Sequence, residues 1–148
     1  MLRTAKQLQT DEDAFQPCPQ DKKAVRAWIE AAKEKSKDAD NATVSLGTRF
    51  EAAYDAAFNV ALAVLNAAGW RHRAVNGHHA FVLEAACAAA GASDATFDRL
   101  DAIRDIRNQN YTGVSRTEAD LQDAKRGFEE FSRIAVAWLQ AEHGNLVR

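Results

Sequence analysis

The stretch LGTRFEAAYDAAFNVALAVLNAA, residues 46–68, is apolar around most of its circumference when it is wound as a helix. Its large apolar side chains recur at helical spacing and are Phe50, Tyr54, Phe58, Leu62 and Leu65. A helix that is apolar on nearly every side has to be covered by other elements. This stretch therefore predicts a central helix in an all-α domain.

Further helices are predicted on both sides of this one, over about residues 20–40, 75–90, 93–109 and 115–143. Ser115 and Glu118 form a capping-box pattern at the start of the last one. The alternation that marks strands is missing, so we expect no strand. Short connections favour an antiparallel four- to five-helix bundle. The expected core residues are Trp28, Phe50, Phe58, Leu62, Phe81, Leu100, Phe128, Phe131 and Trp138.

The chain divides into a polar N-terminal leader, residues 1–20, and one domain, residues 21–148. The leader ends in QPCPQD and is expected to be loosely attached. Cys18 and Cys87 form no CxxC pair, which favours structural roles in a reduced compartment. No segment is long and apolar enough for a membrane span or has the pattern of a signal peptide. We expect a cytoplasmic protein.

The charge balance limits the classes of partner. The chain has 19 Lys plus Arg and 21 Asp plus Glu, for a formal net charge of −2. A protein that coats nucleic acid carries a large excess of positive charge, which is absent here. Any site for a polyanion must therefore be local.

The segment RDIRNQNYTG, residues 104–113, interrupts an apolar helix face with charge. At about 100° of rotation per residue, Arg104, Arg107 and Tyr111 project into the sector of the apolar residues that precede them. An unpaired guanidinium in a dry core costs several kcal/mol. The arginines must therefore line a cleft, meet a carboxylate such as Asp55, or face an interface. A structural ion pair and a phosphate pocket are both open alternatives.

Other polar residues extend this hypothesis. Arg49 and Asp55 lie on the central helix and must reach its rim or form a buried network. The adjacent His78 and His79 point about 100° apart and cannot readily grip one ion, so no metal site is predicted. The basic run at residues 71–73 joins the pocket only if it lies at the same end of the bundle.

Three segments carry a family resemblance: RFEAAYDAAFNVALAVLNAAGWRHRAVNGHHAFVLEA, RLDAIRDIRNQNYTG and SRTEADLQDAKRGFEEFSRIAVAWL. Their order resembles the HEPN superfamily, named for higher eukaryotes and prokaryotes nucleotide-binding, over about residues 22–140. The resemblance implies a four- or five-helix bundle that dimerises. It also implies a link to metal-independent ribonucleases of toxin–antitoxin, phage-defence or RNA-processing systems.

The superfamily signature is an arginine followed after four to six residues by a histidine. Here Arg104 is followed by five residues and then Asn110, while Arg107 is followed by Asn108 and then Tyr111. This form is similar to HEPN branches with an altered signature, some of which accompany nucleotidyltransferases. Asparagine can hold a phosphate but cannot exchange a proton at useful pH, as histidine can.

The sequence therefore predicts an RNA- or nucleotide-binding protein without efficient catalysis. An active metal-independent ribonuclease toxin and a non-catalytic interaction bundle are the alternatives. The expected partners are a second copy of the chain and a nucleotidyltransferase-type antitoxin, and no cofactor is expected. The candidate catalytic residues are Arg104 and Asn110, and the candidate binding residues are Arg107, Asn108, Tyr111, Arg49, Asp55, His78 and His79.

Overall fold

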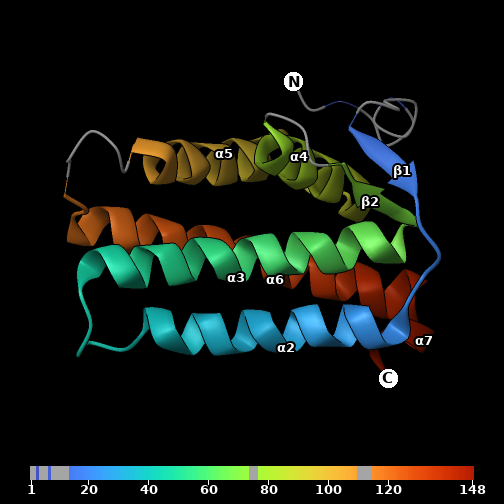
Figure 1. Cartoon of the computed structure of the whole chain (residues 1–148), viewed down its shortest axis with the longest axis horizontal. Coiled ribbons are helices and arrows are strands. Elements are labelled where there is room, and N and C mark those ends of the chain that lie inside the picture. Colours follow the sequence, from blue (N-terminus) through green and yellow to red (C-terminus); the bar gives the residue numbers. More distant parts are fainter. Residues whose placement is uncertain (1–2, 4–6, 8–13, 74–76, 110–114) are drawn as a thin grey trace.

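A computed structural model describes residues 3, 7, 14–73, 77–109 and 115–148 of the chain. Its long helices are α2 (Lys22–Ala39), α3 (Leu46–Ala67), α4 (His78–Ala90), α5 (Asp94–Asn108) and α6 (Glu118–Glu142). The short helix α7 (Gly144–Val147) and the strands β1 (Phe15–Pro17) and β2 (Trp70–His72) complete the described elements. None of the described helices is long and apolar enough to cross a membrane. The predicted all-α bundle is confirmed (Figure 1).

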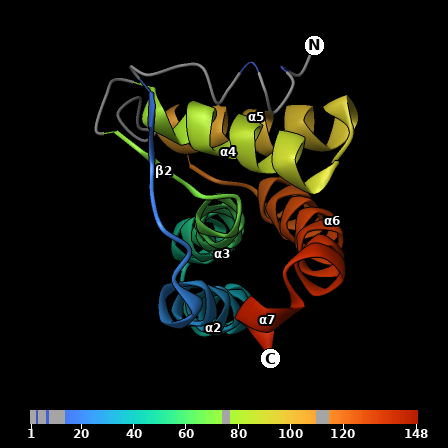
Figure 2. The same cartoon turned by 90° about the vertical axis from the view of Figure 1, so that its right-hand side faces the viewer.

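Helix α3 is the central element, as predicted. It packs against α2 on one side and against α6, α4 and α5 on the others (Figure 2). Along the chain, α2 and α3 run antiparallel, and so do α5 and α6 (Figure 1). Because α3 and α5 also run in opposite directions, the last turn of α5 lies beside the first half of α3 (Figure 1).

The predicted core residues all contribute to the interior. Phe50, Leu100 and Phe131 are buried. The remaining ones are half-buried and pack against the buried clusters: Trp28, Phe58, Leu62, Phe81, Phe128 and Trp138. These larger side chains lie at the edges of the bundle because small alanines fill much of the contact between α3 and its neighbours.

A small sheet corrects two expectations, the absence of strands and the loose attachment of the leader. Strand β1 pairs antiparallel with β2, with Phe15 opposite His72. Ala14 and Phe15 are buried. The backbone N–H of Cys18 donates to the carbonyl of Gly69, which extends the contact to the end of α3. The pairing joins segments far apart in sequence, and runs this short carry no detectable alternation.

The capping box of α6 lies two positions beyond the predicted one. Thr117 Oγ1 accepts a hydrogen bond from the Asp120 N–H at 3.1 Å, and Asp120 Oδ2 accepts one from the Thr117 N–H at 2.9 Å. The helix begins at Glu118, so the capping position belongs to Thr117 rather than Ser115. A Thr-to-Asp pair three residues apart fulfils the same pattern that Ser115 and Glu118 suggest.

Candidate functional site

The centre of the candidate site is a contact between Tyr54 of α3 and His79 of α4. Tyr54 is only 2% exposed, and its hydroxyl oxygen lies 2.7 Å from Nδ1 of His79. The imidazole also stacks on Phe58, with ring centroids 4.2 Å apart. These contacts place the first turn of α4 beside the middle of α3.

Burial sets the protonation states of this pair. It raises the pKa of the Tyr54 phenol, so the phenol stays protonated. Burial, followed by the charges of His78 and Arg107, lowers the pKa of His79 to about 4, so its ring is neutral at physiological pH. A phenol O–H is a stronger hydrogen-bond donor than the N–H of a neutral imidazole, so we expect Tyr54 to donate to Nδ1. With the phenol as donor, the ring proton of His79 resides on Nε2.

Arg107 of α5 adds a positive charge to the pair. Its guanidinium carbon lies 5.0 Å from the centroid of the Tyr54 ring, within the range of a cation–π contact. Its Nε lies 3.1 Å from Oε2 of Glu51, and the two side chains are 30% and 36% exposed. The suggested carboxylate partner Asp55 is therefore wrong. The end of α5 lies near the start of α3, which brings Glu51 within reach instead.

Arg104 pairs within its own helix. Its Nε donates to Oδ1 of Asp101 at 2.8 Å, and its Nη2 lies 3.9 Å from Oδ1 of Asp105. Its charge still acts on the candidate site. It partly offsets the rise that burial causes in the pKa of Tyr54, and it adds to the lowering of the pKa of His79. The charges of two guanidiniums, those of Arg104 and Arg107, therefore act on the same surface between α3, α4 and α5.

Two predicted binding residues of α3 face α2 instead of this surface. Arg49 Nε donates to the carbonyl of Ala39 at 2.9 Å and so closes the end of α2. Asp55 Oδ2 lies 3.9 Å from Lys35 Nζ. Burial, followed by the charge of Glu51, raises the pKa of the Asp55 carboxyl. Arg49 thus takes part in helix capping, and Asp55 lies at the edge of the site.

The remaining candidates differ in placement. Asn108 is exposed and is the last residue of α5. Asn110 and Tyr111 lie outside the described residues. His78 stacks on His72 of β2 with ring centroids 5.1 Å apart, and it contacts the tilted ring of His79 at 4.6 Å. The basic run at residues 71–73 therefore reaches the site through His72.

The sequence did not single out Glu51, Tyr54 and Phe58 as site residues. Both aromatic residues read as members of the apolar stripe of the central helix. The available signal was their spacing, since residues three and four apart share a helix face. That spacing places an acid, a phenol and an aromatic ring in one row.

The site is suited to holding an anion more than to moving protons. The arginines are hydrogen-bond donors, and a neutral imidazole donates from the ring nitrogen that carries its proton. A general acid or base works best with a pKa near the operating pH, and the pKa of His79 is about 4. No group of three His, Cys, Asp or Glu side chains that could hold a metal ion occurs in the part of the chain that the structure describes.

Comparison of the chain with known protein families, with curated proteins and with solved structures finds no match. The HEPN relationship therefore stays a prediction.

Proposed function

We propose that the protein binds phosphate groups of RNA or of a nucleotide at the surface around Tyr54, His79 and Arg107, without efficient catalysis. The observation that carries the proposal is the Arg107 guanidinium, held 5.0 Å from the Tyr54 ring beside the neutral His79. Arginine forks match phosphate oxygens, and aromatic or imidazole groups next to them favour bound nucleotides.

The resemblance to HEPN proteins supports the same ligand class. It also suggests a setting, a toxin–antitoxin or phage-defence system with a nucleotidyltransferase-type partner. Weak catalysis follows from the chemistry of the residues. The pKa of His79 is about 4, so its ring is neutral near pH 7 and does not supply a proton there. Asn110 occupies the signature position and has no titratable group.

Binding of labelled single-stranded RNA, measured by fluorescence anisotropy, tests this proposal. Arg107→Gln should weaken binding at least about tenfold, because a charge-assisted contact to phosphate is lost. Arg126→Gln is the matched control, since Arg126 pairs with Asp123 on an exposed surface of α6. Equal affinities for the wild type and Arg107→Gln would show that the arginine is structural.

A metal-independent ribonuclease is the second candidate. It is favoured by one observation: His79 and Arg107 come from different helices and bear on one surface, so a histidine could replace the one missing from the signature. Cleavage of RNA in the presence of a chelator tests it. The wild type should be slow or silent, and Asn110→His should raise the rate. Rapid cleavage by the wild type that disappears in Arg104→Ala would establish the ribonuclease instead.

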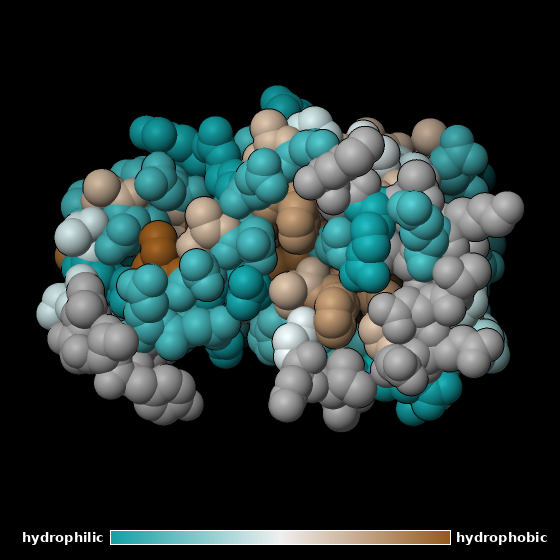
Figure 3. All heavy atoms as spheres, turned by 90° about the horizontal axis from the view of Figure 1, so that it is seen from above, coloured by the Kyte–Doolittle hydropathy of each residue, from teal (hydrophilic) through white to brown (hydrophobic). Residues whose placement is uncertain are grey.

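We also propose a homodimer that uses the face formed by α4 and α5. Hydrophobic side chains show among hydrophilic ones on this face (Figure 3). Half-buried apolar residues of these two helices include Phe81, Ala85, Ala88, Ala89, Phe97 and Ile106, which also pack against the core. Light scattering over a tenfold range of concentration should give the mass of a dimer. A monomer mass throughout would contradict the proposal.

A further inference from the structure

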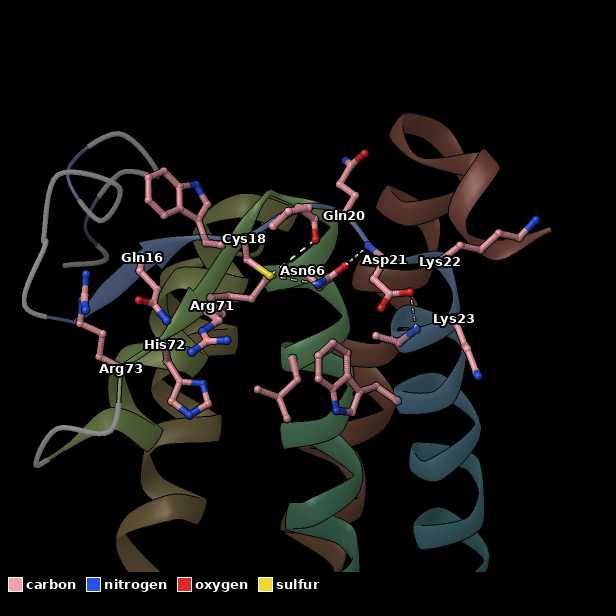
Figure 4. A pocket seen from close by; sticks show the side chains of 16 residues that line it. Gln16, Cys18, Gln20, Asp21, Lys22, Lys23, Asn66, Arg71, His72 and Arg73 are labelled. Carbon is pink, nitrogen blue, oxygen red and sulfur yellow. Dashed lines mark hydrogen bonds between the residues drawn. The ribbon is translucent and has the colours of Figure 1, made fainter.

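A second basic feature lies away from Arg107. A cleft of about 1110 Å³ opens where the start of α2, the end of α3 and β2 meet (Figure 4). Its lining includes four cations, Lys22, Lys23, Arg71 and Arg73, and four large apolar residues, Trp28, Leu62, Leu65 and Trp70. We call this feature the basic cleft. It combines positive charge with aromatic surface, the two elements of single-strand recognition.

The cations of the basic cleft keep their charge unpaired as far as the described residues show. Within the described ranges, none of its four cations forms an ion pair. Among the described residues that line the cleft, the carboxylate is that of Asp21, which caps α2 by accepting the Ala24 N–H at 3.2 Å. The whole chain has a net charge of −2, so this concentration of positive charge is local. Such a potential attracts a polyanion.

The cations are spread rather than converging on one point. Lys22 and Lys23 project from α2, whereas Arg71 and Arg73 belong to the strand side of the cleft (Figure 4). A chain of phosphates can follow separated cations of this kind, with its bases against the indole surface of the lining tryptophans. The arrangement therefore favours an extended strand over a mononucleotide.

A row of rings joins the basic cleft to the candidate functional site. His72 lines the cleft and stacks on His78, which contacts His79. Burial lowers the pKa values of both His72 and His79, which limits repulsion among the three rings. The row therefore connects the basic cleft to the surface around Arg107 through side chains of β2 and α4.

We propose that the basic cleft is a second contact for a single strand of RNA that also binds at Arg107. This inference rests on the proposed function and narrows its ligand from RNA or a nucleotide to an RNA segment several nucleotides long. The cleft supplies phosphate contacts and stacking surface, and the row His72, His78 and His79 lies along the path between the two sites.

Anisotropy titrations with labelled oligoribonucleotides of about 4 and about 16 nucleotides, the range of site sizes for single-strand binding folds, test the inference. The cleft variant combines Lys22→Gln, Lys23→Gln, Arg71→Gln and Arg73→Gln. The control variant removes four exposed cations elsewhere, through Lys33→Gln, Lys37→Gln, Arg126→Gln and Arg133→Gln. The two variants have the same net charge, so they differ only in where the charge is lost.

We expect the cleft variant to bind the longer RNA at least about tenfold more weakly than the control variant. The slope of log K against log salt concentration should be less steep in the cleft variant than in the control variant, by about 3. The reason is that each of the four lost phosphate contacts on a single strand contributes about 0.7. The shorter RNA should bind both variants alike, because it fits at Arg107 alone. Equal binding of the longer RNA by the two variants would overturn the inference.

Cys18 provides a direct readout in the unaltered protein. It lines the basic cleft and is partly exposed, whereas Cys87 is buried. The longer RNA should slow the reaction of Cys18 with a thiol reagent, and adenosine monophosphate should not. Absence of protection by bound RNA would contradict the inference even if the cleft variant failed to fold.

The same data separate this inference from the proposed function. If only Arg107→Gln weakens binding of the longer RNA, and Cys18 stays reactive when that RNA is bound, the proposed function stands and the cleft inference is wrong. If only the cleft variant weakens binding of the longer RNA, the basic cleft is an RNA site by itself, and both the site at Arg107 and a strand that joins the two sites are wrong. Equal affinity for adenosine monophosphate and the longer RNA would overturn the inferred binding of an extended strand. No binding of either RNA or of adenosine monophosphate would overturn both proposals.

Discussion

The hydroxyl of Tyr54 and Nδ1 of His79 lie 2.7 Å apart and connect α3 to α4 at a point where neither side chain is charged at neutral pH. The contact matters because it decides which ring nitrogen of His79 carries the proton. When the phenol donates to Nδ1, as we expect, Nε2–H is the hydrogen-bond donor of His79.

Tyr54→Phe tests this contact, since it removes only the hydroxyl and keeps the ring beside Arg107 and Phe58. We expect a loss of about 1 kcal/mol in the free energy of unfolding, measured in urea. Nitrogen NMR of the imidazole should show one dominant tautomer of His79 in the wild type and a mixture in the variant. An unchanged tautomer in the variant would contradict the assigned hydrogen bond.

The lowered pKa of His79 makes stability depend on pH. Its pKa in the folded protein is about 4, below the ordinary value of 6.5. Its contribution to stability is therefore complete above pH 6.5 and is lost as the pH falls toward 4. We expect a loss on the order of 1 kcal/mol over this window, because the ring is half-exposed and solvent screens it.

The comparison for this pH effect is His79→Gln, which lacks the titrating group. Asp55 has a raised pKa and acts with the opposite sign, since it stabilises the folded state as it takes up its proton. That contribution is common to both proteins and cancels in the difference. Parallel curves of unfolding free energy against pH for wild type and His79→Gln would show that the ring of His79 titrates normally.

The pair of Arg107 and Glu51 should contribute little to stability. Its side chains are 30% and 36% exposed. We expect Arg107→Gln to cost about 1 kcal/mol, from a partly exposed ion pair and the cation–π contact with Tyr54. A fully buried pair would cost about 3 kcal/mol or more. Thermal or urea unfolding of Arg107→Gln, Glu51→Gln and the double variant measures the coupling, and a large value would indicate a structural role.

The packing of α5 on α6 depends on a glycine. A Cβ at Gly127 would lie 2.6 Å from Cδ1 of Ile103, which is only 4% exposed. We expect Gly127→Ala to destabilise the fold by about 1 kcal/mol, because the clash outweighs the gain in helix propensity. Adding Ile103→Val should recover part of the loss, since it removes the clashing methyl group.

Gly47 is the matched control for this prediction. It also lies in a helix, but a Cβ there would meet nothing within 4 Å. Gly47→Ala should therefore stabilise the fold, by about 0.5 kcal/mol. Stabilisation by both glycine variants in urea unfolding would mean that the close approach at Gly127 is relieved by small movements of Ile103.

The start of α6 offers a test of the corrected cap. Thr117→Ala removes the side-chain acceptor of the Asp120 N–H and should cost about 1 kcal/mol. Ser115→Ala removes a hydroxyl outside the helix and should change stability by less than about 0.5 kcal/mol. Equal effects on the urea midpoint would contradict the assignment of Thr117 as the capping residue.

The helices were predictable because their signals are local. Apolar spacing of three and four residues located α3 and its core side chains, and Ser93 and Gly91 bound their helices as expected. The small sheet was not predictable in this way. Strand β1 exists because buried Phe15 anchors it and because β2, far along the chain, offers backbone partners.

The candidate site divides along the same line. The sequence by itself determined that Arg104 and Arg107 interrupt an apolar face and that His79 lies on a helix. Only the tertiary structure decided that Glu51 rather than Asp55 meets Arg107, and that Tyr54 joins His79. Periodicity and caps act within about one helical turn, whereas the choice of partner depends on how separate helices align along one another. That alignment follows from the packing of the whole core.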